Sequence, residues 1–155
     1  MSPPAPPVKH FSQSDANRAL PLVRAIVEDI VELYRDIEER RVRIAGLRRS
    51  RTQARAEDDP YEAEVRDMEQ DLDGDIDRFR LLLDELSTLG VELKDAQTGL
   101  VDFRTLLDGR EACLSWQLGE PEVAHWHELD EETAERRRLE SDVADADTLP
   151  TEDLN

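Results

Sequence analysis

Apolar residues recur at alternating spacings of three and four through the first ninety positions of the chain. The first series is Val23, Ile26, Ile30, Leu33, Ile37, Arg40, Ile44 and Leu47, and the second is Tyr61, Val65, Met68, Leu72, Asp75, Phe79, Leu82 and Leu86. This spacing puts the members of each series along one face of a helix. Because a polar stretch separates the two series, we predict an antiparallel helical hairpin over residues 21–89.

One charged residue interrupts each series, and the two interruptions predict the register of the hairpin. If the chain folds back near Glu57, Arg40 falls opposite Asp75. We expect an ion pair there, which would fix the register more than it would add stability, because desolvation offsets much of the attraction.

The start of the helical half carries a capping signal. Ser12 followed by Asp15 resembles a capping box, and Phe11 is placed to act as a hydrophobic staple. Pro21 removes a backbone donor and is tolerated best in a first turn. We therefore predict a short helix near Ser14 to Leu20, a break, and a long helix that begins near Pro21.

The apolar period changes from helical to alternating after Gly90. The clearest strand alternates Ala112, Leu114, Trp116 and Leu118 with Glu111, Cys113, Ser115 and Gln117. Turn signals at Thr98–Gly99 and Asp108–Gly109 separate it from earlier short strands. Residues 90–128 thus predict an antiparallel sheet of about four strands on the base of the hairpin, and the fold class is α+β.

The two ends of the chain differ from the rest in composition. Residues 1–10 are rich in proline and residues 141–155 are acidic, so we expect both to be disordered around a single domain spanning residues 11–140. Residues 130–140 are charged and favour a short surface helix. No apolar run approaches the roughly 18 residues of a membrane span, and one cysteine allows no internal disulfide. A cytoplasmic location is therefore expected.

The formal net charge of -18 disfavours nucleic acid and anionic membranes as partners. Seven arginines between residues 40 and 55 nevertheless form a basic segment. Two interpretations stay open: a nucleic-acid-binding tip, or a solvated helix face balanced by carboxylates across the hairpin.

Two histidines provide the candidate chemistry. His125 and His127 are two residues apart in a predicted strand, so both point to one face and could share a divalent metal. A third ligand could come from Asp102, Glu111 or Glu120, and His125, His127 and Glu120 form the favoured set. The alternative is that one histidine packs beside Trp126 while the other hydrogen-bonds to a carboxylate.

Cys113 falls on the polar face of its strand. It could act as a nucleophile if a histidine lay beside it, or it could be a small core residue.

Several short motifs carry a resemblance to a known family. They are Leu20–Pro21, Lys94–Asp95, the run from Gly99 to Phe103, Gly109–Arg110, Leu114, Trp116, Gly119–Glu120 and the run from Trp126 to Glu128. The chain resembles an uncharacterised bacterial family called domain of unknown function 2203, and the resemblance implies no activity. The family pattern favours cysteine at the position of Ser115 and does not demand histidine at that of His125. The polar residues that then remain are Asp102, Arg110, Glu120, His127 and Glu128.

No phosphate-binding glycine loop, nucleophile elbow or Cys-x-x-Cys pair is present in the sequence. The leading functional hypothesis is a non-enzymatic protein-interaction or oligomerisation module that uses the helical hairpin. The alternative is a metal-binding protein or metal-dependent enzyme centred on His127.

Overall fold

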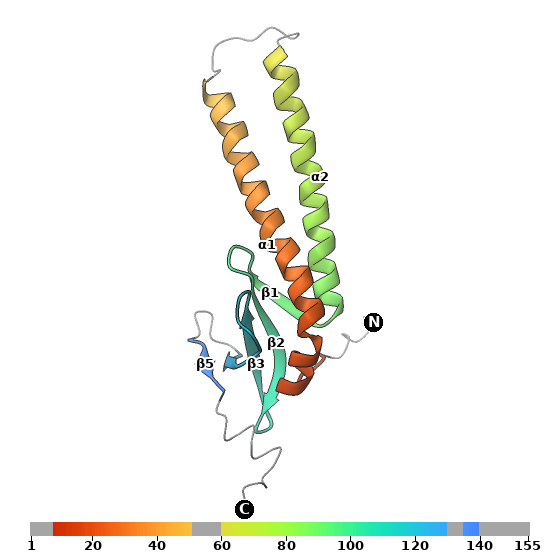
Figure 1. Ribbon diagram of the computed structural model, residues 1–155, viewed down its shortest axis with the longest axis vertical. Helices are drawn as coiled ribbons and strands as arrows, with labels where there is room; N and C mark the ends of the chain where they lie inside the picture. The colour runs from red at the N-terminus through yellow and green to blue at the C-terminus, as the bar shows by residue number, and fades with distance from the viewer. Residues whose placement is uncertain (1–7, 51–59, 130–134, 140–155) are drawn as a thin grey trace, which may run out of the picture.

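The computed structural model describes residues 8–50, 60–129 and 135–139. Two long helices, α1 (Gln13–Ser50) and α2 (Pro60–Thr88), are followed by an antiparallel sheet (Figure 1). Its strands are β1 (Val91–Asp95), β2 (Leu100–Leu107), β3 (Arg110–Gln117), β4 (His125–Glu128) and β5 (Arg137–Arg138). The predicted α+β class and helical hairpin are confirmed. The predicted fold-back near Glu57 and the predicted disorder of residues 1–7 and 141–155 lie outside the described residues.

The register of the hairpin follows from its two charged interruptions. The Nη2 atom of Arg40 lies 3.6 Å from the Oδ2 atom of Asp75, and its Nη1 atom lies 3.5 Å from Asp71. The predicted pairing of Arg40 with Asp75 is therefore confirmed. Around it the seam buries Ile37 and Ile44 of α1 and Val65 of α2.

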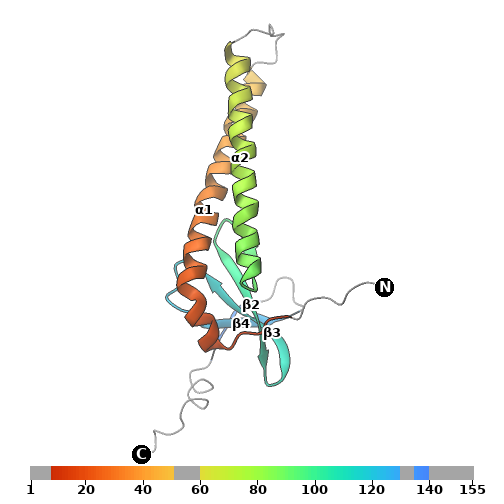
Figure 2. The ribbon, with the colours of Figure 1, turned by 90° about the vertical axis from the view of Figure 1, so that its right-hand side faces the viewer.

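The hairpin is longer than the sheet that supports it. The 38 residues of α1 correspond to roughly 57 Å of helix. Figures 1 and 2 show the sheet packed beside the base of the hairpin, while the far half of both helices extends beyond it. Neither helix, within the residues described, is both long and apolar enough to cross a membrane.

The helix α1 runs without a break through Pro21, so the predicted interruption there is wrong. The capping box is present: the backbone N–H of Asp15 donates to Ser12 Oγ at 2.9 Å, and that of Ser12 donates to Asp15 Oδ2 at 3.2 Å. Leu20 and Val23, on either side of the proline, are both buried in one core. Their packing offsets the roughly 3 kcal/mol that an internal proline costs.

The sheet has five strands in the order β1-β2-β3-β4-β5, rather than about four. The extra strand, β5, pairs with β4, and the backbone N–H of Leu139 donates to Ala124 O at 2.8 Å. The helix predicted for residues 130–140 is thus wrong for residues 137–138; residues 130–134 and 140 lie outside the described residues. Two arginines carry no alternating apolar pattern, so only backbone pairing reveals this strand.

One glycine fixes the sheet against α1. Gly99, in the turn between β1 and β2, has a φ of +76°, and a Cβ atom there would lie 2.8 Å from Leu118 Cβ and 2.9 Å from Val27 Cγ1. Only glycine allows this turn to approach the helix so closely.

The inner face of the sheet completes the core. Val101, Phe103, Leu114 and Trp116 are all buried there against residues of α1 such as Val27. Because side chains alternate along a strand, the residues between them point to the opposite, outer face.

Candidate metal centre

Strand register brings the polar residues of three strands together on the outer face. Asp102 pairs with Ser115, and Arg104 pairs with Cys113 across β2 and β3. Cys113 also pairs with His127, as Ser115 does with His125, across β3 and β4. Directly paired residues share a face, so this face carries carboxylate, thiol and imidazole groups side by side.

Four of these polar side chains are buried, although neither of the two helices that the structure describes packs on this face. They are Asp102, Cys113, Ser115 and His127, with exposed fractions of 3%, 4%, 0% and 9%. Buried polar groups are costly unless they find partners, so the partners of each decide what the face does.

The imidazole of His127 is held by both of its nitrogens. Its Nδ1 atom lies 2.8 Å from the carbonyl oxygen of Glu128, and its Nε2 atom lies 2.9 Å from Asp102 Oδ2. A carbonyl oxygen can only accept, so Nδ1 carries the proton and donates it. The Nε2 atom and Asp102 Oδ2 then need a cation between them, which is either a shared proton or a metal ion.

The carboxyl group of Asp102 is only half satisfied. Its Oδ1 atom is buried and has no hydrogen-bond partner within the described part of the chain. Burial raises the pKa of Asp102 above its ordinary value, and the contact with His127 opposes this rise. The site therefore holds a buried carboxyl oxygen that has no hydrogen-bond partner among the described residues.

Cys113 lies beside this pair. Its Sγ atom, one nitrogen of His127 and one oxygen of Asp102 all lie within 4.8 Å of one another. Burial, with the charge of Asp102 adding to it, raises the pKa of the Cys113 thiol to about 11. Since both nitrogens of His127 are already engaged, neither is placed to take the thiol proton, and the geometry is not that of a cysteine–histidine nucleophile.

Among the described residues, the one group with metal-ligand spacing is Asp102, Cys113 and His127. The structure does not bring the predicted set His125, His127 and Glu120 together. Same-face neighbours along a strand are about 6.6 Å apart, and each histidine contacts a different carboxylate, since the Nδ1 atom of His125 lies 3.8 Å from Glu120 Oε2.

The other predicted site residues form two separate clusters. Glu120 binds the guanidinium of Arg136, with Oε1 to Nη2 at 2.8 Å and Oε2 to Nη1 at 2.9 Å. Arg136 also donates to Ser115 Oγ at 2.7 Å. Arg110 lies 3.7 Å from the carboxylate of Glu128.

Glu111, another predicted third ligand, lies outside the metal-spaced group. It accepts from Arg104 at 2.8 Å and lies 2.9 Å from His10. Both contacts lower the pKa of Glu111, with that of Arg104 the larger.

Sequence reasoning missed Cys113 as a partner of His127. Alternation placed Cys113 on the polar face, but only the register of β3 with β4 puts it opposite His127. It also did not identify Glu120 and Ser115 as the partners of Arg136, because the segment around Arg136 lacks a strand pattern.

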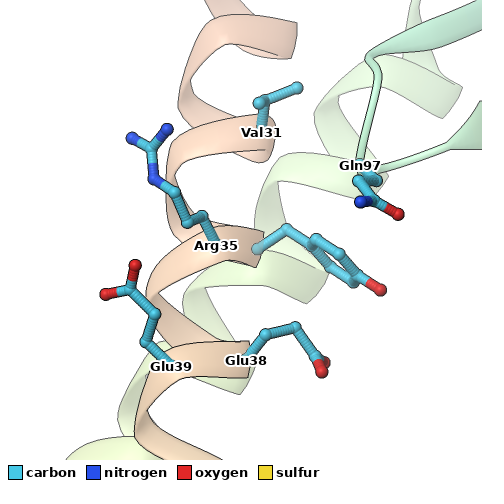
Figure 3. Close-up of a pocket in the computed structure, with 6 residues that line it drawn as sticks. Val31, Arg35, Glu38, Glu39 and Gln97 are labelled. Atoms are coloured by element: carbon cyan, nitrogen blue, oxygen red, sulfur yellow. The ribbon is translucent and has the colours of Figure 1, made fainter.

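A hollow lies away from this face, where the turn between β1 and β2 meets α1 (Figure 3). Its volume is about 410 Å³, and it is lined by Val31, Tyr34, Arg35, Glu38, Glu39 and Gln97. The ring of Tyr34 lies 6.2 Å, centre to centre, from that of Phe79 of α2. Its lining mixes both charges around an aromatic ring and contains no group with metal-ligand spacing.

The basic segment of α1 is largely paired within the hairpin. Arg48 Nη2 lies 2.7 Å from Glu69 Oε2, and Arg41 Nη1 lies 3.2 Å from Glu38 Oε2. Residues 51–59, with Arg51 and Arg55, are outside the described chain.

These features define a class: an α+β protein in which a helical hairpin rests on one face of an antiparallel sheet and a polar, buried cluster occupies the other. The chain belongs to the family described as "Uncharacterized conserved protein (DUF2203)", which it matches over residues 9–139. The resemblance noted in the sequence is thereby confirmed. Comparison with curated proteins finds no match, and neither does comparison with solved structures.

Proposed function

We propose that this protein binds a divalent transition metal, of which zinc is the best fit, through Asp102, Cys113 and His127. The observation that carries the proposal is the buried carboxyl group of Asp102, which lies beside an imidazole nitrogen and a thiol and whose Oδ1 atom has no hydrogen-bond partner among the described residues. A cation at this point would supply the missing partner of the carboxylate.

The donor geometry suits zinc. Bonds of about 2.0–2.3 Å in a tetrahedral arrangement separate neighbouring ligand atoms by roughly 3.3–3.6 Å. The three donor atoms already lie within 4.8 Å of one another, so small side-chain rotations are enough. The bond from Nδ1 of His127 to Glu128 O leaves Nε2 as the donor to the metal, and such a second contact commonly orients a histidine ligand.

The donor types also favour zinc over magnesium or calcium. Thiolate and imidazole are soft or borderline ligands, whereas magnesium and calcium prefer oxygen. The metal would displace the proton of Cys113, whose thiol stays protonated at neutral pH without it. A cytoplasmic location, as expected from the single cysteine, would keep this thiol reduced.

Three protein ligands leave one tetrahedral position open. Structural zinc sites are usually closed by four protein ligands, whereas catalytic sites keep one position for water or substrate. The proposed class is therefore a metal-binding protein of the open, catalytic type.

The test is zinc content after equilibrium dialysis of the full chain, purified without a histidine tag. We expect about one zinc per chain, and less than roughly a tenth of that in Cys113→Ser or His127→Ala. His125→Ala is the matched control, because His125 lies on the same strand and face but outside the cluster. Its zinc content should match that of the wild type.

Two results would overturn the proposal. One is a wild-type protein that retains no zinc although it is folded by circular dichroism. The other is loss of zinc in His125→Ala with retention in Cys113→Ser, which would favour the pairing of His125 with His127.

A second candidate function, self-association through the hairpin, is supported by its exposed apolar side chains. Val42, in the far half of α1, is 68% exposed, and Leu81, in the half of α2 nearer the sheet, is 63% exposed. Among the described residues, no third layer covers the far half of the hairpin (Figure 1). Apolar side chains that two helices cannot bury against each other favour packing against a further protein surface. The favoured occupant is a second copy of the chain, and another protein is the alternative.

Sedimentation equilibrium tests this second candidate. The wild type should be dimeric, and Val42→Lys with Leu81→Lys should shift it to monomer. Leu106→Lys, at an exposed site on β2, is the control and should leave the dimer intact. A monomeric wild type at all concentrations would refute self-association.

A further inference from the structure

We infer that the fourth position on this metal takes a small oxyanion, a carboxylate or phosphate group, which Arg104 holds in place. The inference rests on the proposed metal site. It adds the chemical class of the ligand and a residue that selects it.

Arg104 borders the cluster and has an unused donor. It stands directly opposite Cys113 in the register of β2 with β3, on the same outer face. Its Nη2 atom donates to Glu111 Oε1 at 2.8 Å. Its Nε atom, however, is buried and has no hydrogen-bond partner in the described part of the chain.

This arrangement would leave an N–H group of Arg104 available next to the residue pair that holds Cys113. The contact with Glu111 fixes one edge of the guanidinium, and the Nε–H remains for an acceptor. Arginine has five donors and no acceptor, and it binds carboxylate and phosphate oxygens in preference to neutral groups. An anion that binds the metal through one oxygen could therefore also accept a hydrogen bond from Arg104.

The charge of the metal-loaded site would not repel a small anion. A divalent metal would be balanced by the carboxylate of Asp102 and the thiolate of Cys113, which leaves no net charge on the cluster. Arg104 and Lys94 both act on Cys113 as nearby positive charges, opposed by Glu92. Lys94 lies 3.7 Å from Glu92, so Arg104 is the cation whose donor remains unmatched.

The exposure of these residues limits the ligand to a small one. The three proposed ligands of the metal are at most 9% exposed, whereas the side chain of Arg104 is 34% exposed. Arg104 is thus a neighbour of the buried cluster that is itself in contact with solvent, and we expect a ligand to approach the cluster along its side chain.

The experiment uses the full chain loaded with Co²⁺, whose visible absorption reports its coordination. Acetate and inorganic phosphate are titrated separately, as probes of the two oxyanion types. We expect at least one of them to change the spectrum with saturation. In Arg104→Gln the dissociation constant should rise about tenfold or more, with one metal still bound. Arg110→Gln, at an arginine in the same strand pair, is the matched control and should bind the anion as the wild type does.

Each outcome has a distinct meaning. If saturation occurs with acetate only, with phosphate only or with both, and is weakened by Arg104→Gln, the inference holds and the preferred oxyanion is identified. If Co²⁺ binds but neither anion alters the spectrum, or if Arg104→Gln binds as tightly as the wild type, the inference is wrong while the metal site stands. If Co²⁺ does not bind, the proposed function itself fails.

Discussion

The two faces of the sheet use the same strands but bury different chemistry. The inner face buries Phe103 and Trp116 against the helices, and its composition is explained by packing alone. The outer face buries Asp102, Cys113 and His127 to a similar extent, although burial of polar groups opposes folding. Packing stability therefore explains the residues of the inner face. The outer face retains buried polar groups that oppose folding, and binding of a ligand would explain why they are there.

The largest expected effect on stability comes from a substitution on the inner face. Trp116 is fully buried, and its indole N–H donates to the carbonyl oxygen of Glu120 at 3.0 Å. Trp116→Ala should lower the free energy of unfolding by about 3–5 kcal/mol, because it leaves a cavity and an unpaired acceptor. Urea denaturation measures this. A loss below about 1 kcal/mol would show that the inner face is not the main source of stability.

The next largest effect is stabilisation by zinc, which should depend on residues of the outer face. Zinc at one hundred times its dissociation constant should add about 2.7 kcal/mol to the free energy of unfolding. The gain should vanish in Cys113→Ser, because a ligand is lost, but persist in His125→Ala. Thermal unfolding with and without zinc measures both. An equal gain in all three proteins would mean that the metal binds elsewhere.

A smaller effect tests whether a partly buried charge pair in an apolar seam implies a ligand. Arg40 and Asp75 interrupt an apolar seam without a metal-spaced group around them. Replacing both, by Arg40→Met with Asp75→Leu, should leave the free energy of unfolding unchanged or raise it slightly, because the pair is only partly buried, whereas either single change should lower it. Chemical denaturation of the three variants measures this. A large loss in the double variant would contradict the view that this pair serves register alone.

The smallest effect concerns the ion pair between Glu120 and Arg136, the residue just before β5. Burial opposes ionisation of Glu120, but hydrogen bonds from Arg136 and the Gln117 N–H outweigh it and hold the pKa of Glu120 below 4.5. A lowered folded-state pKa means that this contribution to stability is present above about pH 4.5 and is lost as pH falls through the folded value. The stability difference between wild type and Glu120→Gln should therefore shrink in acid. Denaturation curves from pH 7 to 3 measure it, and a difference that grows in acid would contradict the assignment.

Much of the fold could be predicted because its signals are local and periodic. The spacing of the apolar residues located both helices, and the interruptions at Arg40 and Asp75 gave their register. Pro21 misled the prediction, because tertiary packing on both sides of a proline outweighs its local cost. Strand β5 could not be predicted, because its two arginines have no apolar alternation and only their backbone pairing with β4 reveals the strand.

The candidate site was predicted less completely because it depends on register between strands. His127 and Asp102 were both recognised as polar candidates, but nothing in the sequence states that they lie 2.9 Å apart. Alternation could place Cys113 on the correct face without revealing that His127 stands opposite it. Side chains from three strands meet only when the pairing of those strands is known.

The most direct test of the central claim is X-ray absorption at the zinc edge of the zinc-loaded protein. The account predicts one sulfur at about 2.3 Å with nitrogen and oxygen donors at about 2.0–2.2 Å, and loss of the sulfur shell in Cys113→Ser. A zinc environment without sulfur in the wild-type protein would contradict the claim that Asp102, Cys113 and His127 form a metal centre.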